Sequence, residues 1–158
     1  MKSVVFLYTG GDSTKAEKLR DYLHVRLRKL VNSMRSVTDI LAEDQDFIWE
    51  LRNSDCVVLI GSRQASSLIQ NKQQENEDEY VIFDGKALHE EFTENRALVK
   101  DKLIIVYLAN RTKNDWIPDN FDEKRVFDLQ GENIEEGPLL YQLEYSIRRI
   151  LGETILDW

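Results

Sequence analysis

Two stretches of this 158-residue chain carry residue types that could do chemistry. The first is Thr-Gly-Gly-Asp-Ser at residues 9–13, directly after an apolar run. Backbone N–H groups in such a turn, at the start of a helix, can hold a phosphate. The turn lacks the lysine and glycine spacing of a P-loop, and it lacks the three glycines of a dinucleotide-binding fingerprint. An ordinary strand-to-helix turn is therefore the competing interpretation.

The second stretch is His89-Glu90-Glu91, which offers an acid or a base on a predicted helix. Adjacent helical side chains point in different directions, so Glu90 and Glu91 cannot act as a facing carboxylate pair. Solvent-exposed glutamates are the competing interpretation. His24 is the only other histidine and no HExxH spacing occurs, so we expect no metal site. No serine lies in a GxSxG elbow.

The charge and the cysteine content argue against several classes of function. The net charge is −8, whereas nucleic acids and anionic membrane surfaces need a positive face. Cys56, the single cysteine, lies in an apolar run, which predicts a buried, inert thiol in a reducing compartment. No apolar run approaches the ~20 residues of a membrane span, and the opening run is too short for a signal peptide. We therefore expect a cytoplasmic domain without membrane insertion.

The predicted elements are organised around residues 54–62, Ser-Asp-Cys-Val-Val-Leu-Ile-Gly-Ser, whose apolar run predicts a strand buried on both faces. Further strands are predicted at 4–8 and 103–108, and weaker ones within 31–38, at 80–83 and at 126–129. Helices are predicted at 14–30, at 64–70, at 86–99 and from Pro138 onward, and a further short helix is predicted to end near Asn53. We expect Trp116 to anchor a loop, and the polar run near 71–79 to be a surface insertion.

Strands and helices thus alternate along the chain, which predicts an α/β fold. We expect a three-layer, flavodoxin-like architecture: an open, mostly parallel, five-stranded sheet with helices on both faces. The connections between parallel strands should be right-handed. The length fits one domain covering residues 1–158.

The order of these segments resembles that of the Toll/interleukin-1 receptor (TIR) domain and its relative, the interleukin-17-receptor-type SEFIR domain. The strongest match is the "helix, Ser-Asp, apolar strand, Ser" segment at residues 48–62. Three other segments also match. Tyr8-Thr9-Gly10-Gly11-Asp12 is similar to the box that ends the family's strand A, and Asp39-Ile40-Leu41 is similar to its BB loop. Residues 103–108 with Trp116-Ile117-Pro118 are similar to the family's later core strand and the Ile-Pro that follows it. The chain departs from the family where Trp-Cys would precede the helical glutamate, since Ala87 and Leu88 stand there.

The resemblance implies an intracellular signalling domain that assembles immune or inflammatory complexes with other TIR- or SEFIR-like domains. Association would be homotypic or heterotypic, with weak self-association and no cofactor. The interaction loop that the resemblance implies contains Asp39, Ile40, Leu41, Glu43 and Asp44.

The resemblance also implies an alternative, because some TIR domains cleave the nicotinamide–ribose bond of NAD⁺ with one glutamate. In that case NAD⁺ is the substrate, and the catalytic residue here would be Glu91. The nucleotide would be held by Tyr8, Thr9, Gly10, Gly11 and Ser62. This enzyme needs an open cleft in which Glu91 faces the turn at residues 8–12.

Overall fold

The structure is a computed structural model that describes residues 2–8, 13–36, 47–70, 85–108, 115–130 and 137–152. The strands are β1 (Lys2–Leu7), β2 (Val31–Ser36), β3 (Cys56–Gly61), β4 (Leu103–Tyr107) and β5 (Val126–Asp128). The α-helices are α1 (Ser13–Leu27), α3 (Phe47–Asn53), α4 (Arg63–Ile69), α5 (Gly85–Glu94) and α6 (Pro138–Ile150). A π-helical turn, η3 (Leu98–Lys102), precedes β4, and a 3₁₀ turn, η4 (Glu123–Arg125), precedes β5.

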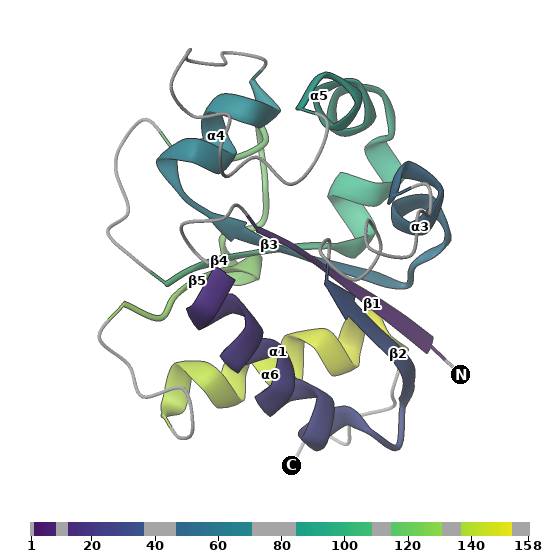
Figure 1. The fold of residues 1–158 in the computed structure, drawn as a ribbon, viewed down its shortest axis with the longest axis vertical. Helices are drawn as coiled ribbons and strands as arrows, with labels where there is room; N and C mark the ends of the chain where they lie inside the picture. The colour runs from purple at the N-terminus through teal and green to yellow at the C-terminus, as the bar shows by residue number, and fades with distance from the viewer. Residues whose placement is uncertain are drawn as a thin grey trace.

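The described strands form one sheet in the order β2-β1-β3-β4-β5, and every pair is parallel. Helices α1 and α6 cover one face, and α3, α4 and α5 cover the other (Figure 1). This confirms the predicted flavodoxin-like fold. The weak strands predicted within 31–38 and at 126–129 are confirmed as β2 and β5. The strand predicted at 80–83 and the insertion near 71–79 lie outside the described residues.

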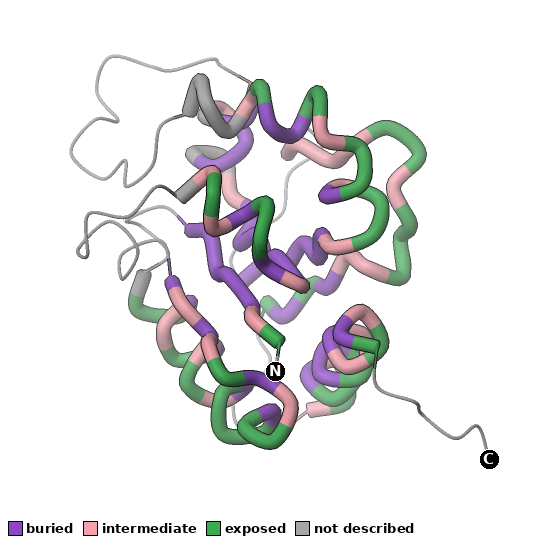
Figure 2. Tube along the Cα trace, turned by 90° about the vertical axis from the view of Figure 1, so that its right-hand side faces the viewer, coloured by how far each residue is buried: buried purple, intermediate pink, exposed green. Residues whose placement is uncertain are grey.

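Strand β3 is the centre of the sheet, as its apolar run predicts. All six of its residues are buried, and it pairs with β1 on one side and β4 on the other. Figure 2 shows the sheet as a buried layer between helices whose outer sides are exposed. Burial raises the pKa of the Cys56 thiol to about 12, with Arg125 opposing and Asp55 adding to the shift. The thiol is therefore protonated at neutral pH, and a protonated thiol is a poor nucleophile.

Helices α1 and α6 lie side by side and pack on the sheet through apolar stripes at helical spacing. The fully buried members of the two stripes are Ala16, Leu19, Leu23 and Leu27 on α1 and Leu140, Leu143 and Ile147 on α6. Between the helices, the Glu144 carboxylate accepts hydrogen bonds from Arg26 Nε at 2.7 Å and Arg148 Nε at 3.2 Å. The charge of Glu144 is therefore paired where the helices meet.

The helix predicted at 86–99 differs from the structure at its end. The α-helix α5 stops at Glu94, and a wider π-helical turn, η3, follows. The side-chain oxygen of Asn95 accepts a hydrogen bond from the backbone N–H of Leu98 at 3.1 Å. Asn side chains compete with the backbone for donors in this way, which favours a break in a regular helix.

Gly61, the last residue of β3, lies opposite Tyr107 in the register of β3 and β4. A Cβ atom added at Gly61 would lie 2.5 Å from Cε1 of the Tyr107 ring. Tyr107 is fully buried, so its ring has little room to move aside. The glycine is required here by the close approach of an aromatic ring.

Replacing Gly61 by Ala should therefore destabilise the fold by about 1–3 kcal/mol, the usual cost of overpacking a core. Urea denaturation of wild type, Gly61→Ala, Tyr107→Leu and the double variant measures both the cost and its cause. In the Tyr107→Leu background the alanine should cost much less, since the obstructing ring is gone. Equal costs in the two backgrounds would contradict the steric explanation.

Candidate functional site on helix α3

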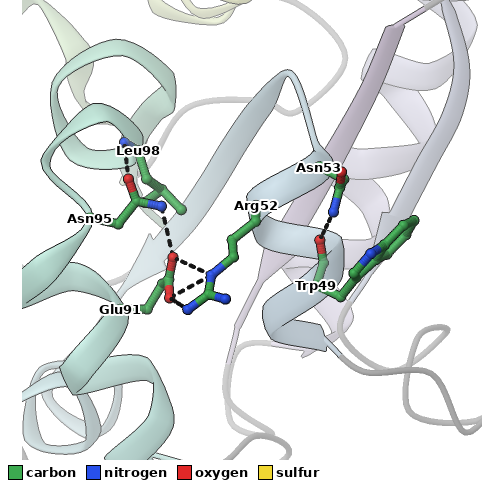
Figure 3. Close-up of polar contacts among 6 residues, drawn as sticks. All are labelled: Trp49, Arg52, Asn53, Glu91, Asn95 and Leu98. Atoms are coloured by element: carbon green, nitrogen blue, oxygen red, sulfur yellow. Dashed lines mark hydrogen bonds and ion pairs between the residues drawn. The ribbon is translucent and has the colours of Figure 1, made fainter.

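Helix α3 presents two large side chains to solvent. Trp49 is 59% exposed, and the side chain of Arg52 is 63% exposed. The two residues are three apart in the helix, but their side chains point in different directions: Arg52 reaches toward Glu91 of α5, and the Trp49 ring points away from it (Figure 3). Leu51 is fully buried and fixes the helix to the core. The end of the helix is closed by the side-chain amide of Asn53, which donates to the carbonyl of Trp49 at 2.8 Å.

Arg52 is held by Glu91 of α5 in a bidentate ion pair (Figure 3). Arg52 Nε lies 3.1 Å from each carboxylate oxygen, and Nη2 lies 2.9 Å from Oε2. The amide of Asn95 donates to Oε1 at 2.7 Å, and this same side chain accepts from Leu98. One chain of contacts therefore runs from α3 through α5 to η3.

Other contacts also fix α3. Glu50 pairs with Arg35 of β2 at 3.5 Å, and Lys102 Nζ donates to the carbonyl of Arg52 at 3.1 Å. The helix is thus tied to α5, to the sheet and to the turn before β4. Since these contacts restrict the backbone and the guanidinium beforehand, less conformational freedom remains to be lost when α3 binds another molecule.

The environment of Glu91 keeps its carboxylate ionised. Its side chain is only 4% exposed, and burial by itself would raise its pKa. The hydrogen bonds from Arg52 and Asn95 outweigh the burial and hold the pKa of Glu91 below its usual value. Three N–H groups therefore donate to the two oxygens of this carboxylate, from Nε and Nη2 of Arg52 and from the amide of Asn95. In this arrangement Glu91 supports the position of Arg52.

The other predicted nucleotide-binding residues that the structure describes are Tyr8 and Ser62. The Tyr8 hydroxyl donates to the carboxylate of Glu17 on α1. The Ser62 hydroxyl accepts from the backbone N–H of Ala65 at 3.0 Å at the start of α4. Helix α1 and the α3–α5 layer lie on opposite faces of the sheet, so the structure does not bring the Tyr8 hydroxyl and Glu91 together (Figure 1). Their roles toward NAD⁺ stay predictions.

The remaining predicted site residues lie outside the described part of the chain. These are Thr9, Gly10 and Gly11 of the predicted nucleotide-binding turn and Asp39, Ile40, Leu41, Glu43 and Asp44 of the predicted interaction loop. That loop precedes α3 in the chain, so the exposed Trp49 follows it closely in sequence. The structure therefore adds Trp49 and Arg52, which sequence reasoning did not assign to a site. Their only sequence signal was the placement of a large aromatic and an arginine on either side of Leu51 in the sequence.

A hollow of about 430 Å³ lies beside α5 and includes His89, Phe92 and Trp116 in its lining. His89 Nδ1 lies 2.5 Å from the carbonyl of Ile69. Since a carbonyl only accepts, Nδ1 is the donor there. The Trp116 ring lies 5.2 Å from the Phe92 ring, and its backbone N–H donates to Ser66 Oγ at 2.7 Å. These contacts hold Trp116 against α4 and α5, while most of the loop that it is predicted to anchor lies outside the described residues.

Among the described residues, no group of three or more His, Cys, Asp or Glu side chains could hold a metal ion. In the same residues, no helix has both the length and the apolar character needed to span a membrane.

Comparisons of the chain with models of known protein families, with curated proteins and with solved structures find no match. Inference about function must therefore start from the residues and geometry of this chain.

The ion pair between Arg52 and Glu91 should contribute to stability, and its loss can be measured. Replacing Glu91 by Gln keeps the shape but removes the charge, and should cost about 1–3 kcal/mol at pH 7. Folding lowers the pKa of Glu91. The ion pair therefore stabilises the fold fully at a pH above the pKa of Glu91 in the unfolded state, and this stabilisation is lost as the pH falls through the pKa of Glu91 in the folded state. The difference between wild type and Glu91→Gln should therefore shrink in acid.

Urea denaturation at neutral pH and at about pH 3.5 tests this. Glu90→Gln is the matched control, because Glu90 is the exposed neighbour on the same helix. A cost for Glu90→Gln as large as that for Glu91→Gln, or a cost that does not depend on pH, would contradict the assignment.

Proposed function

We propose that the chain is a cytoplasmic signalling domain of the TIR or SEFIR kind, which assembles immune or inflammatory complexes by binding other such domains. Helix α3 forms the described part of the binding surface, and the interaction loop that the resemblance implies at residues 39–44 precedes it in the sequence. The observation that carries the proposal is the pair of exposed side chains Trp49 and Arg52 on a helix fixed from several sides. Tryptophan and arginine are among the residues most enriched at the energetic centres of protein interfaces.

The sheet order supports the same proposal, because the doubly wound, flavodoxin-like arrangement is the one that the resemblance implies. Fold alone does not determine function, so the surface of α3 has to carry the inference. On this surface the charged groups have a structural role. Arg52 is positioned by Glu91, and the exposed part of the pair is the cation.

The contacts of Glu91 favour binding over the cleavage of NAD⁺. To support the positive charge that develops on the ribose, a carboxylate must face the substrate. Glu91 instead faces Arg52 and Asn95, and its side chain is buried. A substrate would have to displace the guanidinium of Arg52 before reaching it.

Self-association at high concentration tests the proposed surface. Sedimentation velocity over a range of concentrations should show weak association of the wild type. Trp49→Ala and Arg52→Glu should each weaken it by about tenfold or more, since loss of an interface centre costs about 2 kcal/mol. Val25→Ala is the matched control, because Val25 is an exposed apolar residue on α1, on the other face of the sheet. Equal association by all four proteins would overturn the proposed surface.

The alternative activity is tested with the wild type and the two glutamate variants. Nicotinamide release from NAD⁺ is measured for the wild type, Glu91→Gln and Glu90→Gln, with folding checked by circular dichroism. We expect no turnover. Release that disappears in Glu91→Gln and persists in Glu90→Gln would make the chain an enzyme and place Glu91 in its active site.

A further inference from the structure

The outer side of α6 carries a stripe that the fold itself does not use. Tyr141, Tyr145 and Arg149 recur every four residues, so they lie in one line along the helix. Tyr141 is 51% exposed and Tyr145 is 40% exposed, while the neighbouring Leu140 and Leu143 are fully buried. Two of the four exposed large apolar side chains among the described residues therefore lie on this single helix face.

The stripe lines a groove of about 770 Å³. Lys124 and Arg125 of η4 and Asp122, the residue before η4, line the same groove. Phe127 of the edge strand β5 and Ile150 of α6 add apolar surface. The groove thus combines exposed aromatic rings with basic side chains, and its volume is in the range of functional binding pockets.

The charge of the groove is opposite to that of the whole chain. Three basic side chains and one carboxylate line it, whereas the chain has a net charge of −8. The carboxylate of Asp122 accepts from the backbone N–H of Lys124 at 2.9 Å, so it is partly occupied in capping η4. Among the described residues neither Lys124 nor Arg149 forms an ion pair. The guanidinium of Arg149 lies over the Tyr145 ring, 6.0 Å from its centroid.

We propose that this groove binds an acidic protein segment that carries aromatic or aliphatic side chains. Carboxylates of the segment pair with Lys124 and Arg149, and an apolar side chain of the segment packs against Tyr141 and Tyr145. Charge complementarity selects an acidic partner, and the tyrosines supply rigid contact area. The proposal does not rest on the proposed function, because α6 and α3 lie on opposite faces of the sheet (Figure 1).

Fluorescence anisotropy with a fluorescein-labelled peptide, EEDFEELDEE, tests the groove on the whole chain. The wild type should bind it, and Arg149→Glu and Tyr145→Ala should each weaken binding at least tenfold. Tyr145→Phe should bind nearly as the wild type does. Lys18→Glu is the matched control, since it makes the same change of charge on the exposed side of α1, outside the groove lining. Circular dichroism confirms that every variant is folded.

Several results would overturn the proposal. They are no binding by the wild type, equal weakening by Arg149→Glu and Lys18→Glu, and equal binding of the basic peptide KKKFKKLKKK. Equal binding of EEDAEEADEE, or displacement of the peptide by low concentrations of inorganic triphosphate, would mean that the groove holds anions without using its aromatic surface. Self-association of the free chain that Arg149→Glu abolishes would make a second copy the occupant.

Discussion

Strand β3 is buried on both faces, and this constraint determines the arrangement of everything else. A strand with apolar side chains on both sides needs a layer of helices above and below it. Of its two partners, β4 is buried throughout and β1 is buried from Val4 to Leu7, so the helices must cover three strands on each face. Asp55 fixes the register at the amino end. Its side chain accepts from the backbone N–H of Ser3, and its own backbone N–H donates to the carbonyl of Ser3, each at 2.9 Å.

This layered arrangement explains where the charged groups are. Helices on one face must pack against one another as well as on the sheet. Charged side chains where two helices meet lose contact with water, which costs free energy unless the charges are paired. Glu91 meets Arg52 at the seam between α5 and α3, and Glu144 meets Arg26 at the seam between α6 and α1. In both pairs the carboxylate is the buried partner and the arginine is the more exposed one. The arginines reach out of the seam because their long side chains keep the guanidinium in water.

Apolar runs made the sheet predictable, since the strands at 4–8, 56–60 and 103–108 consist of aliphatic and aromatic residues and one cysteine, with Val, Ile and Leu in the majority. The strand at β2 was weakly patterned because Asn32, Ser33 and Arg35 interrupt it, and only its pairing with β1 shows why it is a strand. The break after α5 depends on a single side-chain contact of Asn95, which no periodicity reveals.

The candidate site was less predictable than the fold. Glu91 was singled out through a family resemblance, but its partner lies 39 residues away in the chain. An ion pair over that separation depends on how two helices pack, which a single sequence does not encode in any local pattern. The tyrosine stripe on α6 could have been predicted from the sequence. Tyr141, Tyr145 and Arg149 have helical spacing, and they lie opposite the apolar stripe that buries the helix.

The two proposed surfaces should respond to salt to different extents, and the reason lies in the charge of the chain. Two copies with a net charge of −8 repel each other, and salt screens that repulsion over a Debye length of about 8 Å at physiological ionic strength. Added salt lowers this repulsion while it also weakens the charged contacts of Arg52, so association through α3 should depend on salt less than binding of the acidic peptide does. Binding of an acidic segment at Lys124 and Arg149 relies on attraction between opposite charges, which the same salt weakens. Because the sheet separates the two surfaces, each response can be measured without disturbing the other.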